Sequence, residues 1–118
     1  MDQIRARIDY LKNHQPNWDE HGEQVADEDT FEFVYSVFES LVPTLESHHR
    51  FDIGLSDDGG IEVDDIYHKF KQYVGFTFFK NYVICDISNL QDAAKSQQYS
   101  CQYTSLDDVV AFVKKHIV

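Results

Sequence analysis

Hydrophobic residues recur with the period of an α-helix at the start of the chain. Ile4, Ile8 and Leu11 lie three or four positions apart, so they line one face of a helix. We predict a short amphipathic helix over residues 2–13 that ends before the helix-breaking Pro16.

A longer apolar stripe follows after a polar loop and predicts a second, more buried helix. Either Asp27 or Asp29 can cap its first turn, and Pro43 marks its end. The stripe consists of Phe31, Phe33, Val34, Tyr35, Val37, Phe38, Leu41 and Val42. This placement leaves three carboxylates on the outer edge of the helix, namely Glu28, Glu32 and Glu39.

The apolar period changes from helical to alternating in the middle of the chain. Residues 51–55 alternate apolar residues with polar or small ones, which predicts a strand buried on one side. A three-residue turn at 57–59, with Gly59 in the left-handed conformation, keeps the apolar faces of a hairpin aligned. This turn pairs Ile53 with Val63.

The same register sets two carboxylates against each other. Asp52 lies directly across from Asp64 on the solvent side, with Glu62 beside them. Like charges in a cross-strand pair destabilise a hairpin. An arrangement that costs stability indicates that these side chains serve a function.

The second half of the chain is rich in aromatic and uncharged strand residues. We predict a second hairpin with strands over 70–79 and 82–87, turning at Lys80-Asn81. Residues 88–98 are a polar connection, and residues 99–103 form a further short strand.

A last amphipathic helix closes the chain after a cap at Thr104 or Ser105. Its acidic start and basic end suit the helix dipole. Together the elements predict a single α+β domain over residues 1–118: a small antiparallel sheet of two hairpins, with N-terminal and C-terminal helices packed on it.

Charge is distributed unevenly along the chain, whose formal net charge is −11. Residues 1–66 hold 17 of the 21 acidic residues and only four basic ones, whereas residues 67–118 hold four acidic and six basic residues. A folded molecule with this split has one strongly negative side, which attracts cationic partners and repels nucleic acid and anionic membranes. We therefore expect a basic protein partner and no direct binding of nucleic acid or membrane.

The location and the oligomeric state follow from further composition arguments. The sequence after Met1 lacks the apolar core of a signal peptide, and no run of about 18 apolar residues occurs, so we expect a cytoplasmic protein. A reducing compartment predicts that Cys85 and Cys101 are buried free thiols. Self-repulsion favours a monomer, while a dimer face is the alternative for Phe76, Phe78, Phe79 and Tyr82.

Signatures of catalysis and metal binding are weak. A phosphate loop, a nucleophile elbow and zinc-peptidase motifs are absent from the sequence. His48 and His49, with Glu46, are candidate metal ligands, but the side chains of adjacent residues in an extended loop point in opposite directions. Residues 57–60 lack the ligand spacing of a calcium loop. Cys85 has apolar neighbours, which predict a poorly ionised thiol. We therefore predict no enzymatic activity, no cofactor and no metal.

The candidate binding residues are carboxylates that cluster along the acidic half. Carboxylates four apart on a helix or two apart on a strand are separated by about 6 Å or about 6.6 Å, which is comparable to the spacing of DNA phosphates. Such charges on a rigid surface can occupy the DNA-binding groove of a basic protein, whereas the competing interpretation is that they only maintain solubility. The candidates are Asp19, Glu20, Glu23, Asp27, Glu28, Asp29, Glu32, Glu39, Asp52, Asp57, Asp58, Glu62, Asp64 and Asp65.

In size, charge and order of elements, the chain resembles the small, acidic, monomeric bacterial DNA-mimic proteins that bind the histone-like protein HU. The resemblance covers the whole chain and rests on overall character, since such mimics share no sequence motif. It implies that the chain occupies the DNA-binding face of HU, competes with DNA and is associated with the nucleoid through this partner. Asn17-Trp18-Asp19 with Gly22, and Asp-Gly-Gly-Ile-Glu-Val at 58–63, are also similar to patterns in small uncharacterised bacterial proteins.

Two other kinds of inhibitor share these electrostatics. An immunity protein or antitoxin covers the cationic site of a basic nuclease with carboxylates, and an inhibitor of a nucleic-acid-guided defence complex does the same for its DNA channel. A toxin pair is expected to hold through high salt, whereas a DNA decoy weakens as salt rises.

Overall fold

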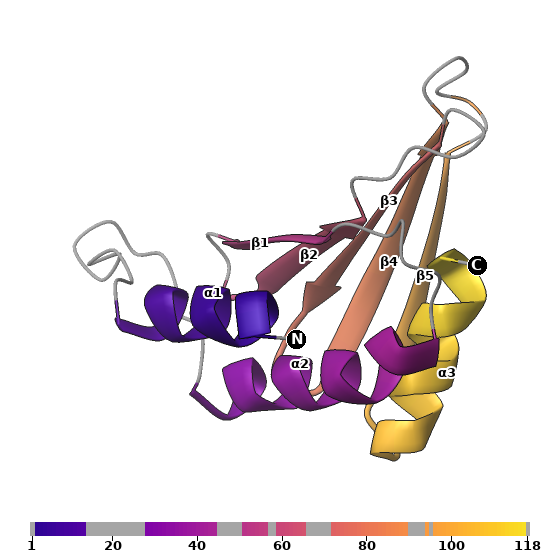
Figure 1. Ribbon diagram of the computed structural model, residues 1–118. Helices are drawn as coiled ribbons and strands as arrows, with labels where there is room; N and C mark the ends of the chain where they lie inside the picture. The colour runs from indigo at the N-terminus through magenta and orange to yellow at the C-terminus, as the bar shows by residue number, and fades with distance from the viewer. Residues whose placement is uncertain are drawn as a thin grey trace.

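The fold is built around one antiparallel sheet. The computed structural model of the chain describes residues 2–13, 28–44, 51–56, 59–65, 72–89, 94 and 96–117. Its five strands lie side by side in chain order (Figure 1). They are β1 (Phe51–Leu55), β2 (Ile61–Asp65), β3 (Gln72–Phe78), β4 (Tyr82–Asn89) and β5 (Gln97–Gln102).

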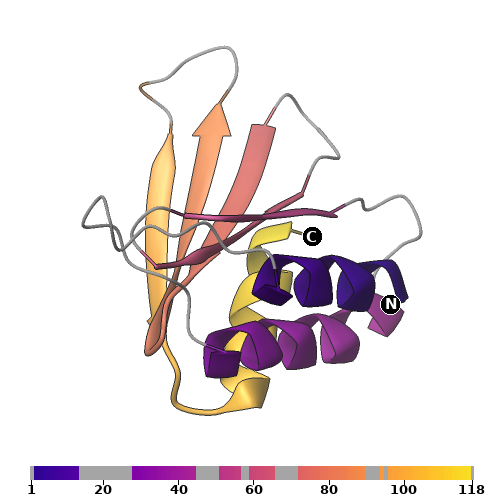
Figure 2. The same ribbon diagram turned by 90° about the vertical axis from the view of Figure 1, so that its left-hand side faces the viewer.

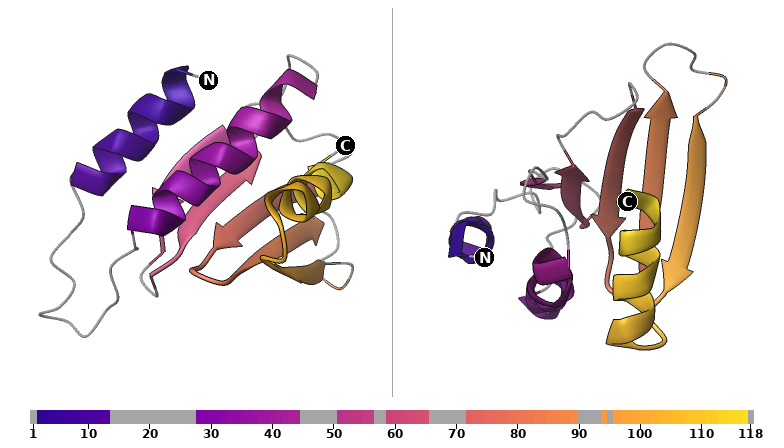
Figure 3. Two further views of the ribbon diagram at one scale, coloured as in Figure 1. Left: turned by 90° about the horizontal axis from the view of Figure 1, so that it is seen from below. Right: turned by 45° about the vertical axis from the view of Figure 1, so that its right-hand side comes forward.

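Three α-helices cover one face of this sheet, which confirms the predicted α+β class. They are α1 (Asp2–Asn13), α2 (Glu28–Leu41), which continues into the 3-10 turn η2 (Val42–Thr44), and α3 (Leu106–Ile117). Seen from below, α2 and α3 lie in front of the strands, and α1 lies alongside α2 (Figure 3). Figure 2 shows α1 between the edge strand β1 and α2, and α1 contacts both of them. None of the described helices is long and apolar enough to span a membrane.

A single hydrophobic core fills the space between the helices and the sheet. The predicted N-terminal helix contributes Ile8 and Leu11, and α2 contributes most of its apolar stripe. Phe38 of α2 meets Phe78 of β3 edge-on, with ring centroids 6.1 Å apart. Phe76 and Phe78 are fully or almost fully buried in this core. The dimer face suggested for these two residues is therefore wrong, because the helices already cover them.

The first hairpin has the predicted register. Ile53 pairs with Val63, and Asp52 pairs with Asp64. Gly59 has a φ of 88°, in the left-handed region that a side chain disfavours. The predicted turn is confirmed at Gly59, while the two aspartates that precede it lie outside the described residues.

The ends of the later elements differ from the prediction. β4 continues to Asn89 and β5 begins at Gln97, because these two strands pair with each other as far as Ile87 and Gln97. The predicted start of β3 at Phe70 lies outside the described residues, and β3 is described from Gln72. The start of β5 is polar, so the pattern of apolar residues did not predict it. An edge strand needs little apolar surface.

Helix α3 begins at a side-chain cap, as predicted. The Ser105 hydroxyl accepts a hydrogen bond from the backbone N–H of Asp108 at 3.1 Å. Asp107 and Asp108 occupy the first turn, and the last turn is basic, so both ends complement the helix dipole. These acidic residues therefore have a local structural role.

Candidate functional site

One face of the sheet points away from the three helices, and the strand register determines which side chains it presents. Successive residues of a strand point to opposite sides. Ile53 and Val63 are partners in the core, so Asp52 and Asp64, one position along, point the other way. We call this side the outer face. Its described residues are Asp52, Gly54, Glu62, Asp64, Tyr73, Gly75, Thr77, Tyr82, Ile84, Asp86, Ser88, Gln98, Ser100 and Gln102.

All charged residues among these outer-face positions are carboxylates. They are Asp52, Glu62, Asp64 and Asp86. The basic residues in the described part of the chain lie on the helices or in the turn between β3 and β4, and they are Arg5, Arg7, Lys12, Lys80, Lys114 and Lys115. Within the described residues, the charges of the outer face are thus all negative, whereas the helices carry charges of both signs, with more acidic than basic residues.

The backbones of Asp52 and Asp64 face each other at a hydrogen-bonded position of the β1–β2 ladder. The backbone N–H of Ser56 donates to the Gly60 carbonyl at 2.9 Å, and hydrogen-bonded pairs recur at every second position of an antiparallel ladder. Asp52 and Asp64 lie two such steps along, so their Cα atoms are about 5.5 Å apart. Glu62 is two residues from Asp64 on the same strand and side. Three carboxylates thus share a small area of the outer face.

Tyr73 and Gly75 shape the surroundings of Asp64. Gly75 is the cross-strand neighbour of Asp64, and a Cβ atom on Gly75 would lie 2.6 Å from Asp64 Oδ1 and 3.1 Å from Tyr73 Cε1. The Asp64 carboxylate and the Tyr73 ring therefore fill the space that glycine leaves. Burial, a hydrogen bond to Asp64 and the charges of the nearby carboxylates raise the pKa of Tyr73 above its ordinary value.

Asp86 extends the acidic row across the sheet. It pairs with Gly75 on β3 and with Gln98 on β5, so it lies two strands from Asp64, at about 9.6 Å. The Gln98 side-chain amide donates to Asp86 Oδ1 at 2.8 Å and holds the carboxylate in place. Sequence reasoning missed Asp86, although its predicted hairpin already set Asp86 across from Gly75. The sequence did not show that β2 pairs with β3, and this pairing is what brings Asp86 into line with Asp64 through Gly75.

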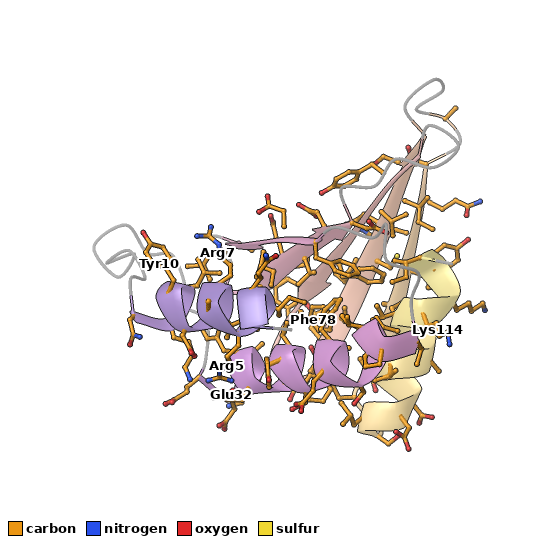
Figure 4. The ribbon with its side chains drawn as sticks, in the orientation of Figure 1. Arg5, Arg7, Tyr10, Glu32, Phe78 and Lys114 are labelled. Atoms are coloured by element: carbon orange, nitrogen blue, oxygen red, sulfur yellow. The ribbon has the colours of Figure 1, made fainter. Side chains whose placement is uncertain are left out.

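The carboxylates on α2 have a different environment, because α1 supplies cations to them. Glu32 accepts two hydrogen bonds from the Arg5 guanidinium, at 2.6 and 3.0 Å, and one from Lys12 Nζ at 3.1 Å (Figure 4). Lys12 also lies 3.5 Å from Glu28. The hydrogen bonds from Arg5 and Lys12 hold the pKa of Glu32 at about 2. Much of the negative charge at the start of α2 is therefore neutralised within the molecule.

The remaining predicted site residues fall into three groups. Asp29 and Glu39 are exposed on α2. Asp65 is only 4% exposed and lies on the core side of β2, so it cannot present its charge to a partner and we leave it out of the proposed surface. Six others lie outside the described residues: Asp19, Glu20, Glu23, Asp27, Asp57 and Asp58.

The cysteines do not offer a reactive site. Cys85 is buried in the core, and burial, with a smaller contribution from Asp86, raises its pKa to about 12. Cys101 is partly exposed, and both thiols are free. In the part of the chain that the structure describes, three or more metal-ligating side chains do not come together.

Comparisons of the chain with protein-family models, with curated proteins and with solved structures yield no match. The interpretation of the outer face therefore depends on its geometry and charge.

Proposed function

We propose that this protein is a DNA mimic whose outer face presents phosphate-like carboxylates to a basic DNA-binding protein, an HU-like nucleoid protein in the cytoplasm, and competes with DNA for it. The observation that carries this proposal is that the charges on the described outer face are all of one sign. The described outer-face residues include four carboxylates and no cation. A surface of one sign attracts an oppositely charged groove and repels nucleic acid.

The outer face supports this function better than α2 does. A carboxylate such as Glu32, already bound to Arg5, must break that ion pair before it can meet a partner's lysine or arginine. Asp52 and Glu62 are exposed on the outer face. A cation of a partner can approach these exposed carboxylates directly from solvent. We therefore assign partner binding to Asp52, Glu62, Asp64 and Asp86.

The strands also hold these carboxylates in advance of binding. Their spacing is set by the sheet, at about 4.8 Å between strands and about 6.6 Å between alternate residues of one strand. Repulsion between Asp52 and Asp64 is already present in the folded protein, and an arriving cation relieves it. Folding thus already supplies the free energy that is needed to bring these like charges together, so binding does not have to supply it and is stronger.

A competition experiment with purified HU tests the proposal. The chain is titrated into HU bound to a fluorescent DNA duplex, and release of the duplex is measured by anisotropy. The outer-face variant carries Asp52→Asn, Asp64→Asn and Asp86→Asn, which keep side-chain shape and acceptor oxygens. The control variant carries Glu28→Gln, Asp29→Asn and Glu39→Gln on α2, with the same change in net charge.

We expect the outer-face variant to compete about thirtyfold less well, corresponding to about 2 kcal/mol for three lost charge contacts, and the control to lose less than about threefold. Equal losses in the two variants would show that only total charge matters. Failure of the unmodified chain to displace DNA would refute the assignment to an HU-like partner.

Salt separates this function from inhibition of a basic nuclease. A DNA decoy should release its partner as salt rises, because screening weakens exposed charge pairs. A partner recovered from lysate on the immobilised chain that resists high salt and proves to be a nuclease would favour the immunity function instead.

A further inference from the structure

Two stacked aromatic rings lie at one end of the outer face, beyond the carboxylates. Thr77 pairs with Glu62 and therefore points to the outer side as well. A Cβ atom on Gly60 would lie 2.7 Å from Thr77 Cγ2 and 3.1 Å from Phe79 Cε1, so the Phe79 ring lies on this same side. The Phe79 ring stacks on Tyr82, with centroids 4.9 Å apart. We call Phe79 and Tyr82 the aromatic pair.

The aromatic pair remains open to solvent. Tyr82 is 40% exposed, and Phe79 is partly exposed. The other large hydrophobic side chains that are exposed in the described part of the chain lie elsewhere: Tyr10 belongs to α1, and Tyr99 pairs with the core residue Cys85 and so points to the helix side. Exposed aromatic surface bordered by polar residues is typical of a protein interaction site.

The turn that carries the aromatic pair is fixed from behind. The backbone N–H of Phe79 donates to the Tyr82 carbonyl at 2.8 Å and closes a two-residue turn. Tyr103 ties this turn to the core: its backbone N–H donates to the Asn81 carbonyl at 3.1 Å, and its hydroxyl donates to the Phe79 carbonyl at 2.6 Å. The Tyr103 ring packs on Phe33 of α2, with centroids 4.3 Å apart. A partner therefore has little disorder to remove when it binds here.

Charge and area indicate what covers the aromatic pair. A second copy that covered the whole outer face would set its carboxylates against those of the first copy, and like charges repel. A second copy that touched only the aromatic pair would bury two rings from each chain, well below the about 1,200 Å² of a stable interface. A basic protein meets neither objection, because its cations complement the carboxylates on the same face.

We propose that the aromatic pair is a second contact element of the partner-binding surface and packs on an aliphatic side chain beside the cationic groove of the basic partner. This inference rests on the proposed function. Tyr82 and Asp86 lie four residues apart on β4, so the apolar contact is about 13 Å from the nearest end of the acidic row. Carboxylates attract any basic groove, whereas a rigid aromatic contact selects a groove with an apolar neighbour at this distance.

The competition assay with HU and a fluorescent DNA duplex tests the aromatic contact. We expect Tyr82→Ala to displace DNA about tenfold less well than the unmodified chain, and Tyr82→Phe, which keeps the ring, to compete within about twofold of it. Tyr99→Ala is the matched control, because Tyr99 is 39% exposed but lies on the helix side, and it should also compete within about twofold. Circular dichroism verifies that each variant is folded.

Salt distinguishes the apolar contact from the charge contacts. The loss in Tyr82→Ala should be the same at about 0.05 M and about 0.3 M salt, whereas the loss in the outer-face variant should shrink as salt screens its charges. Displacement of DNA by Tyr82→Ala as effective as by the unmodified chain would overturn this inference and leave the proposed function standing. Failure of the unmodified chain to displace DNA would overturn both. A dimer in sedimentation equilibrium that Tyr82→Ala dissociates would assign the aromatic pair to a second copy and overturn the inference.

Discussion

The cross-strand pair of aspartates makes a direct prediction about stability. Asp52 is exposed on β1, across from Asp64 and diagonal to Glu62. Asp52→Asn removes one charge and keeps the shape and the low strand propensity of the side chain. We expect this substitution to stabilise the protein, although most surface substitutions are neutral or mildly destabilising.

The magnitude follows from the geometry of the ladder. Two unit charges about 5.5 Å apart repel by about 0.75 kcal/mol in water, and screening at physiological salt lowers this to about 0.4 kcal/mol for Asp52 and Asp64. Glu62, at about 7 Å on the diagonal, adds about 0.25 kcal/mol. Asp52→Asn should therefore raise the free energy of unfolding by about 0.6 kcal/mol and the melting temperature by about 3 °C.

The salt dependence of this gain distinguishes charge repulsion from other causes. Urea unfolding should show a gain of about 1 kcal/mol at about 0.01 M salt that shrinks to about 0.2 kcal/mol at about 1 M. Asp52→Glu, which keeps the charge, should show no gain. The reasoning is refuted if Asp52→Asn destabilises the protein or if its gain is the same at all salt concentrations.

Three further predictions concern the rest of the molecule. Glu32→Gln should lower the free energy of unfolding at pH 7 by about 1 kcal/mol, because it removes a half-exposed ion pair with Arg5. The pKa of Glu32 in the folded protein is about 2, below its ordinary 4.5. Urea titrations should therefore show the full difference between the two proteins above about pH 4.5 and no difference as the pH falls toward 2. Gly75→Ala should cost about 1–2 kcal/mol through its contact with Asp64, and a double-mutant cycle with Asp64→Ala should recover part of that cost. Cys85 should react with a thiol reagent at neutral pH only after unfolding, because it is buried and its pKa is raised to about 12; rapid reaction in the folded protein would contradict the core position.

Local patterns in the sequence were sufficient to predict the helices and the first hairpin. The spacing of Ile4, Ile8 and Leu11 predicted α1, and the need to keep Ile53 and Val63 on one side predicted the register of β1 and β2. These predictions succeed because side-chain direction depends on short-range backbone geometry. The like-charge pair on β1 and β2 followed from the same argument.

The neighbours of each carboxylate were decided by tertiary packing. Glu32 was expected on an open helix edge, but α1 packs against α2 and brings Arg5 and Lys12 to it. Asp65 was expected at the surface with Asp64, but it is buried on the core side, as the alternation from Val63 along β2 already implied. Contacts between residues distant in the sequence set the charge environment, and a linear count of acidic residues does not contain them.

The sequence by itself determined the helical and strand periods, the tight turn at Gly59 and the excess of acidic residues in the first half of the chain. Only the tertiary structure decided that all three helices share one face of the sheet, that Asp86 joins the acidic row of the outer face and that β5 is an edge without charge. The physical reason is that periods and turns depend on neighbouring residues, whereas strand order and helix placement depend on which apolar surfaces bury one another.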